Sequence, residues 1–145
     1  MKIGHVGINV TNLERSVPFY CEVFQLTVFH RSDESGKKFA FLGREDEITI
    51  TLWEQSNGVF SSQSPGMHHF AFEASSLDDV KLKEKQLKSM GVAFIYPDLT
   101  PHMEGAESGG IYFLDPDGIR LEIYAKTGLQ AYQQHTTEGP ACGFF

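Results

Sequence analysis

Two stretches of the chain resemble each other at a constant separation, and this internal repeat constrains the fold more than any other feature. His5, in residues 4–10, corresponds to His69, in residues 68–74, which lies 64 residues further along the chain. The five residues that follow each stretch correspond at the same separation. Each stretch alternates apolar and polar residues, which is typical of a β-strand, and then reaches helix-start residues. The repeat therefore predicts two related halves.

A helix is expected after the first strand of each half. Thr11 with Glu14, and Ser75 with Asp78, are spaced like a capping box at a helix N-terminus. Apolar residues then recur at helical spacing. In the first half these are Leu13, Val17, Tyr20 and Phe24, with Pro18 inside the window, and in the second they are Leu77, Val80, Leu87 and Met90, with Gly91 at the end.

Three further strands complete each half, so the predicted order in both is β-α-β-β-β. We expect these strands at residues 27–33, 38–42 and 47–54, and then at 92–96, 110–114 and 119–125. The chain is predicted to be one α+β domain over 1–145, with two modules forming a cupped mixed sheet and the helices outside. Module 1 covers about 1–55, a Ser- and Gly-rich linker 56–66, module 2 about 67–125 and a C-terminal tail 126–145. In the tail, Leu129, Tyr132, Phe144 and Phe145 are apolar; they are interpreted as a frayed end or as a segment that docks on the cup or a partner.

Strand periodicity predicts which side chains oppose the helices. Successive side chains of a strand point to opposite faces of its sheet. Val6, Ile8 and Val10 should therefore pack on a helix, which leaves His5 and Asn9 on the other face. The same rule places polar and aromatic residues on the opposite faces of the other strands. These residues are Thr51, Trp53, His69, Glu73, Arg120, Glu122 and Tyr124.

Three of these residues are candidate metal ligands. His5 and His69 occupy equivalent places in the two halves, and Glu122 lies in a late strand of the second half. Two imidazoles and one carboxylate bind one face of a divalent ion and leave other positions open for water or substrate. We expect one divalent metal ion per chain, with Fe, Mn, Ni, Co or Zn as candidates.

The sequence resembles the vicinal oxygen chelate superfamily, which includes glyoxalase I, extradiol dioxygenases, fosfomycin-resistance thiol transferases and bleomycin-resistance proteins. The resemblance covers about residues 3–125. It is strongest in three stretches, His5-Val6-Gly7-Ile8-Asn9-Val10, His68-His69-Phe70-Ala71-Phe72-Glu73 and Gly110 to Glu122. It implies paired βαβββ modules around a metal, with His5, His69 and Glu122 at the family's ligand positions.

Residues at other positions of the resemblance distinguish between the reactions of the family. Glyoxalase I-like members carry a carboxylate at the position of Thr51, which is a poor ligand for these ions. Fosfomycin enzymes carry basic residues for the phosphonate, and no matching Arg or Lys lies near 102–106 or 131. Extradiol dioxygenases place a Tyr ten residues before the Glu ligand and a His upstream of it, which Tyr112 and His102 match. A second pocket His of those enzymes is missing at 53–55.

The implied function is a metal-dependent enzyme acting on a small oxygen-chelating substrate, as a dioxygenase or a lyase or isomerase. Candidate acid–base groups are Tyr112, His102 and Glu73, and the substrate pocket is predicted to hold Asn9, Thr51, Trp53, Arg120 and Tyr124. The alternative is a non-catalytic protein that sequesters an aromatic antibiotic, as bleomycin-resistance-like members do.

Several of these residues also have structural interpretations. Strand histidines are often only hydrogen bonded, a buried Tyr such as Tyr112 usually packs, and His102 is by default an exposed loop residue. Glu73 and Arg120 are interpreted as a surface ion pair. His68 has the opposite parity to His69 and is predicted to face the helix.

Composition limits the partners. The 145 residues carry a net charge of −7, which disfavours nucleic acid and anionic membranes. Cys21 and Cys142 are isolated, and the start of the chain reads as a strand, so a reducing cytoplasm is expected. The predicted partners are a small-molecule substrate or drug and a second copy of the chain, as a homodimer.

Overall fold

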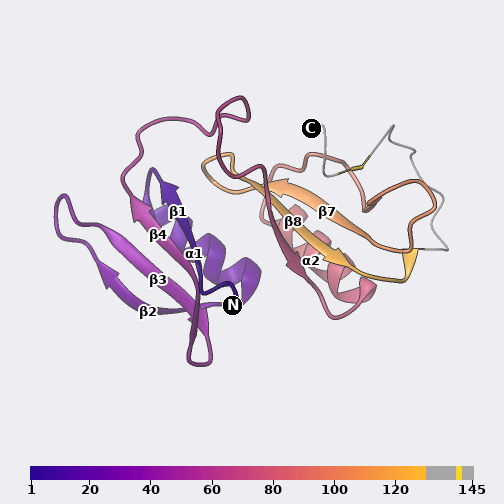
Figure 1. Cartoon of the computed structure of the whole chain (residues 1–145), viewed down its shortest axis with the longest axis horizontal. Helices are drawn as coiled ribbons and strands as arrows, with labels where there is room; N and C mark the ends of the chain where they lie inside the picture. The colour runs from indigo at the N-terminus through magenta and orange to yellow at the C-terminus, as the bar shows by residue number, and fades with distance from the viewer. Residues whose placement is uncertain (130–139, 142–145) are drawn as a thin grey trace. The chain divides into compact units, whose positions relative to one another are not determined.

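The computed structural model describes residues 1–129 and 140–141 (Figure 1). The chain divides into two compact units, Met1–Phe60 and Ser61–Phe145. Each unit contains one of the predicted halves, and each is described by itself.

Unit 1 is a four-stranded sheet with one helix. Its elements are β1 (Val6–Val10), α1 (Leu13–Phe24), β2 (Thr27–Ser32), β3 (Phe39–Arg44) and β4 (Glu47–Glu54). The strand order is β1-β4-β3-β2, in which β1 runs parallel to β4 and the other neighbours are antiparallel.

Unit 2 repeats this arrangement. Its elements are β5 (Phe70–Glu73), α2 (Leu77–Ser89), β6 (Thr100–Pro101), β7 (Gly109–Leu114) and β8 (Arg120–Ala125). The order β5-β8-β7-β6, with β5 parallel to β8, reproduces that of unit 1. The predicted α+β class and the repeat are therefore confirmed, with the strands forming two separate mixed sheets.

The helix starts differ from the prediction by one residue in both halves. Asn12 caps α1, because its Oδ1 accepts the backbone N–H of Arg15 at 3.2 Å. Ser76 caps α2 in the same way, accepting from the N–H of Asp79 at 3.1 Å. Thr11 and Ser75 are therefore not the caps, although Asn12 and Ser76 keep the separation of the repeat.

The prediction of a strand at 92–96 is wrong, because this segment forms no regular strand. Only Phe94 forms a bridge to β7, although the N–H of Ile95 donates to the carbonyl of Tyr112 at 2.8 Å. Pro97 follows this segment and has no N–H with which to continue a ladder. The regular pairing resumes only at β6, which has two residues.

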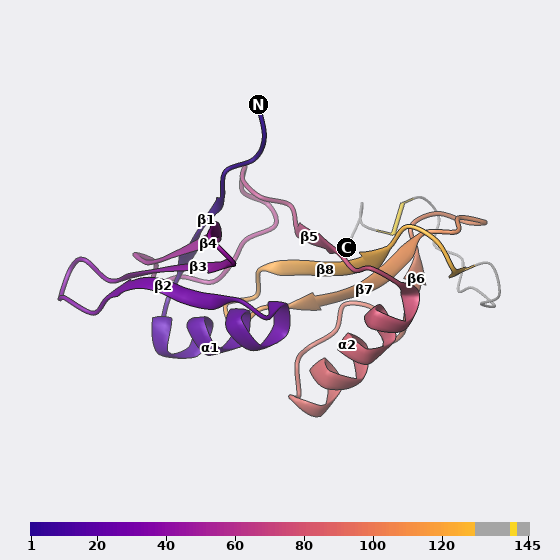
Figure 2. The same cartoon turned by 90° about the horizontal axis from the view of Figure 1, so that it is seen from below.

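Burial agrees with the predicted helix-side faces of β1, β4 and β8, although Thr51 and Glu122 on the opposite faces are buried as well. Alternate apolar residues of β1, β4 and β8 are buried, including Ile8, Val10, Ile50, Leu52, Leu121 and Ile123. Each helix covers one face of its own sheet, α1 in unit 1 and α2 in unit 2 (Figure 2). The opposite faces are left to the polar and aromatic side chains.

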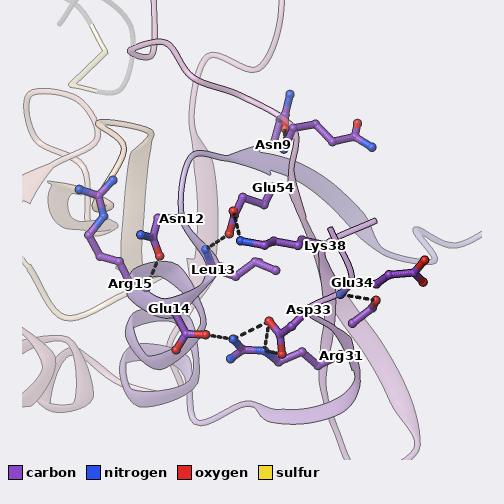
Figure 3. A network of polar contacts seen from close by, with 12 residues as sticks. Asn9, Asn12, Leu13, Glu14, Arg15, Arg31, Asp33, Glu34, Lys38 and Glu54 are labelled. Carbon is purple, nitrogen blue, oxygen red and sulfur yellow. Dashed lines mark hydrogen bonds and ion pairs between the residues drawn. The ribbon is translucent and has the colours of Figure 1, made fainter. Parts of the chain in front are cut away.

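A carboxylate connects the end of β4 to the start of α1. One oxygen of Glu54 accepts the backbone N–H of Leu13 at 2.8 Å, and the other accepts from Nζ of Lys38 at 2.8 Å (Figure 3). The first N–H groups of a helix have no partner within the helix, and its N-terminus favours negative charge. Glu54 therefore holds α1 against the sheet together with the cap residue Asn12.

Replacing Glu54 should lower stability in a pH-dependent way. The N–H of Leu13 and then Lys38 hold the pKa of Glu54 below its ordinary value. Its contribution is present above the unfolded-state pKa, about 4.3, and is lost as the pH falls through the folded-state pKa. We expect Glu54→Ala to cost about 1 kcal/mol in urea unfolding at pH 7. The difference from the unchanged protein should shrink below pH 4; a constant difference would contradict the charge contribution.

The described residues contain no helix with the length and apolar composition needed to cross a membrane. In the predicted tail, Leu129 is buried and its N–H donates to the carbonyl of Glu107 at 3.1 Å. Tyr132, Cys142, Phe144 and Phe145 lie outside the described residues.

Candidate functional site

The polar face of the sheet in unit 2 is centred on Glu122. This residue lies on β8 between Ala71 of β5 and Tyr112 of β7, its register partners. Its side chain is almost fully buried, with 2% of the residue exposed. A buried carboxylate requires hydrogen-bond or charged partners, and two imidazoles provide them here.

The first partner of Glu122 is His102, which directly follows β6. Nε2 of His102 lies 2.6 Å from Oε1 of Glu122, and Nδ1 lies 2.8 Å from Oγ of Ser108. The ring also packs against Tyr124, with 5.3 Å between ring centroids. Interpreting His102 as an ordinary loop histidine is therefore wrong, because both ring nitrogens contact polar groups.

The second partner of Glu122 is His69, whose Nε2 lies 3.4 Å from Oε2 of Glu122. Burial lowers the pKa of His69 below the ordinary imidazole value, although the charge of Glu122 acts in the opposite direction. A lowered pKa favours neutral imidazole, which is the form that binds metals. Two of the three predicted ligands are thus side by side in unit 2.

His68 does not face the helix as predicted. The residue is exposed, and its Nδ1 lies 2.9 Å from Nδ1 of His69. Both residues precede Phe70, the first residue of β5. The alternation of a regular strand therefore does not hold at His68, which explains the error.

Glu73 pairs with Lys126, at 2.8 Å, which corrects the predicted pair with Arg120. Glu73 also accepts a hydrogen bond from the hydroxyl of Tyr124 at 3.3 Å. The hydrogen bond from Lys126 holds the pKa of Glu73 below its usual value, whereas burial and the nearby Glu73 raise the pKa of Tyr124. Glu73 thus remains ionised and Tyr124 protonated at neutral pH.

Tyr112 is fully buried on β7 and lies opposite Glu122 in the antiparallel register. Directly opposed residues share one face of a sheet, so the two side chains leave the same face of unit 2. Its ring packs edge-on against Tyr96, with 5.4 Å between centroids. Arg120 lies two residues before Glu122 on β8 and is half-buried.

The sheet of unit 1 carries an aromatic cluster on the face opposite α1. Phe39 lies opposite Trp53, and Phe41 lies opposite Thr51, in the β3–β4 register. The three rings of Phe39, Phe41 and Trp53 lie 4.8 to 5.8 Å from one another, and all three residues are half-buried. Sequence reasoning missed Phe39 and Phe41, although their spacing of two placed them on one face.

Two further predicted residues of unit 1, Thr51 and Asn9, also belong to this side of the sheet. Oγ1 of Thr51 accepts the indole N–H of Trp53 at 3.0 Å, and Oδ1 of Asn9 accepts the N–H of Gln55 at 3.1 Å. His5 is exposed and directly precedes β1. In residues 1–129 and 140–141, no group of three or more His, Cys, Asp or Glu side chains is arranged to hold a metal ion.

The family model of the glyoxalase/bleomycin resistance protein/dioxygenase superfamily matches residues 2–123. The chain belongs to this superfamily. The match covers both repeats and ends one residue after Glu122, so the predicted vicinal oxygen chelate membership is confirmed.

Members of the superfamily with different activities are similar to the chain. A trivalent organoarsenical cleaving enzyme of Bacillus sp. (strain MD1) is 28% identical over 98% of this chain and 83% of that protein. A catechol-2,3-dioxygenase of Bacillus subtilis (strain 168) is 27% identical over 91% of this chain, which spans 44% of that protein. A solved glyoxylase/bleomycin resistance protein/dioxygenase domain from Frankia sp. EAN1pec has a TM-score of 0.73 and 25% identity, over 87% of this chain and 92% of that one.

Proposed function

We propose that the protein is a metal-dependent dioxygenase that opens the ring of a catechol-type substrate. The observation that carries this proposal is the buried Glu122 with an imidazole at each carboxylate oxygen, 2.6 Å from His102 and 3.4 Å from His69. Tyr112 stands opposite Glu122 on the neighbouring strand. This combination matches the Tyr and His expected near the Glu ligand of an extradiol dioxygenase.

The proposed metal ligands are His5, His69 and Glu122. The donor chemistry fits a divalent ion, because neutral imidazole and carboxylate suit Fe(II), Mn(II) and related metals. When bound, the metal would hold the two hydroxyl oxygens of a diol and lower their pKa.

His102 is the proposed acid–base group. Its Nε2 contacts the proposed ligand Glu122 and its Nδ1 contacts Ser108, so a proton that a diol loses would reach the ring through one of these two partners. The Ser108 hydroxyl at its Nδ1 can act as donor or acceptor. Glu73 is less suited to donate a proton, because Lys126 keeps it ionised.

The sheet of unit 1 by itself offers an aromatic surface. Phe39, Phe41 and Trp53 are half-buried rings in mutual contact, and aromatic surfaces gain from stacking on a planar ring. Trp53 and Thr51 were predicted as pocket residues from the sequence.

The other activities found in the superfamily fit less well. A trivalent arsenical is thiophilic and favours soft thiolate ligands, whereas the chain has two cysteines that are far apart in sequence. Burial raises the pKa of Cys21, which disfavours its thiolate. A phosphonate requires clustered cations, and Lys126 is already paired with Glu73.

Ring opening can be tested directly. Protein loaded anaerobically with Fe(II) or Mn(II) should, on addition of catechol and O₂, consume one O₂ per catechol. The reaction breaks the carbon–carbon bond beside the diol and places both oxygen atoms in the product. His69→Ala should be inactive. If the loaded protein consumes no O₂ while an aromatic drug stabilises the metal-free protein, the sequestration alternative is favoured.

A further inference from the structure

His68 and His69 are adjacent in sequence, and their rings contact each other through the Nδ1 atom of each. Nδ1 of His68 and Nδ1 of His69 are 2.9 Å apart, which is hydrogen-bond distance. At that distance one of the two atoms carries a proton and the other accepts it. Nε2 of His69 meanwhile lies on the Glu122 side, 3.4 Å from the carboxylate.

The direction of this hydrogen bond depends on whether Nε2 of His69 binds a metal ion. A neutral imidazole has one N–H and one lone pair. If Nε2 of His69 gives its lone pair to a metal, the proton of that ring is on Nδ1. The only role left to Nδ1 is then to donate, and Nδ1 of His68 is placed to accept.

We propose that His68 is the positioning residue for His69 in metal binding, an inference that rests on the proposed function. It accepts the Nδ1–H of His69 and thereby selects the tautomer in which Nε2 is available to the metal. Metal-binding histidines generally donate their second N–H to such a partner, and losing that partner weakens metal binding about 10- to 100-fold.

The exposure of His68 argues against a packing role. The residue is exposed, whereas His69 and Phe70 beside it are half-buried. Its ring lies edge-on to that of His69, with 5.2 Å between centroids and 81° between planes. This geometry directs the in-plane lone pair of one ring nitrogen toward the other ring, as a hydrogen bond requires.

Three variants separate hydrogen bonding from ring packing. His68→Phe keeps an aromatic ring but removes the acceptor. His68→Asn restores an acceptor, since its Oδ1 takes a place similar to Nδ1. His30→Phe is the matched control, because His30 is also an exposed histidine but lies on β2 of unit 1. Competition titration with Co(II) and Zn(II) gives the affinities, and ¹⁵N NMR of the Zn(II)-loaded protein gives the tautomer of His69.

The expected result is a loss of metal affinity of about 10- to 100-fold for His68→Phe, with most of it recovered in His68→Asn and none lost in His30→Phe. The NMR spectrum should place the His69 proton on Nδ1. Equal affinities for His68→Phe and the unchanged protein would overturn the inference. Metal binding with the expected losses but no ring opening would instead overturn only the proposed dioxygenase function, and an unchanged protein that binds no metal would overturn both.

Discussion

His69→Ala and His5→Ala are each expected to remove the bound divalent metal from the purified protein. Each change deletes one of three proposed protein ligands, and Thr51 is a poor substitute for an imidazole. The loss of affinity should exceed about 100-fold, the upper end of what losing an outer partner costs. Elemental analysis after loading with Mn(II) and gel filtration measures the metal content.

His30→Ala is the control for this experiment and should keep one metal ion per chain. Urea unfolding of each variant without metal checks that the fold is intact. A His5→Ala variant that retains the metal would show that unit 2 binds it with its own residues. A variant that carries both His5→Ala and His69→Ala and still has full metal content would mean that the ligand assignment is wrong.

Gly110→Ala is expected to destabilise unit 2 strongly. A β-carbon at Gly110 would lie 2.8 Å from both Cα and Cβ of Tyr124, its partner on β8. These atoms belong to the neighbouring strand, so β7 and β8 would have to separate. Overpacking of this kind costs about 1–3 kcal/mol, and we expect the upper end because backbone must move. The melting temperature should fall by roughly 10 °C.

Gly66→Ala provides the matched control for Gly110→Ala. A β-carbon at Gly66 meets no atom within 4 Å, so this change should leave the melting temperature nearly unchanged. Equal melting temperatures for the two variants would show that strands β7 and β8 have room that the structure does not predict.

The faces of the strands were predictable because period-two alternation requires only local information. Glu122, Tyr112 and Trp53 therefore lie on the expected side of their sheets. The repeat predicted that the second half has the same arrangement as the first, and the strand order of unit 1 does recur in unit 2. Both predictions rest on patterns within about ten residues or on the constant separation of the two halves.

Contacts between distant segments were not predictable in this way. His102 reaches Glu122 because the loop after β6 closes on itself, with the N–H of His102 donating to the carbonyl of Ser108 at 3.0 Å. Nothing in the spacing of 20 residues specifies such a loop. The error at His68 has a similar origin, because the regular strand begins only at Phe70 and parity does not apply before it.

The parallel pairing of first and last strands has a consequence for how each unit folds. β1 pairs with β4 across 44 residues, from Val6 to Ile50, and β5 pairs with β8 across 51 residues, from Phe70 to Leu121. The antiparallel strands between them close much shorter loops, whose entropy cost is smaller. We therefore expect the meander β2-β3-β4 to form first and β1 to join its edge afterwards. The amide protons of β1 and β5 should accordingly exchange with solvent through partial openings that leave the central strands protected.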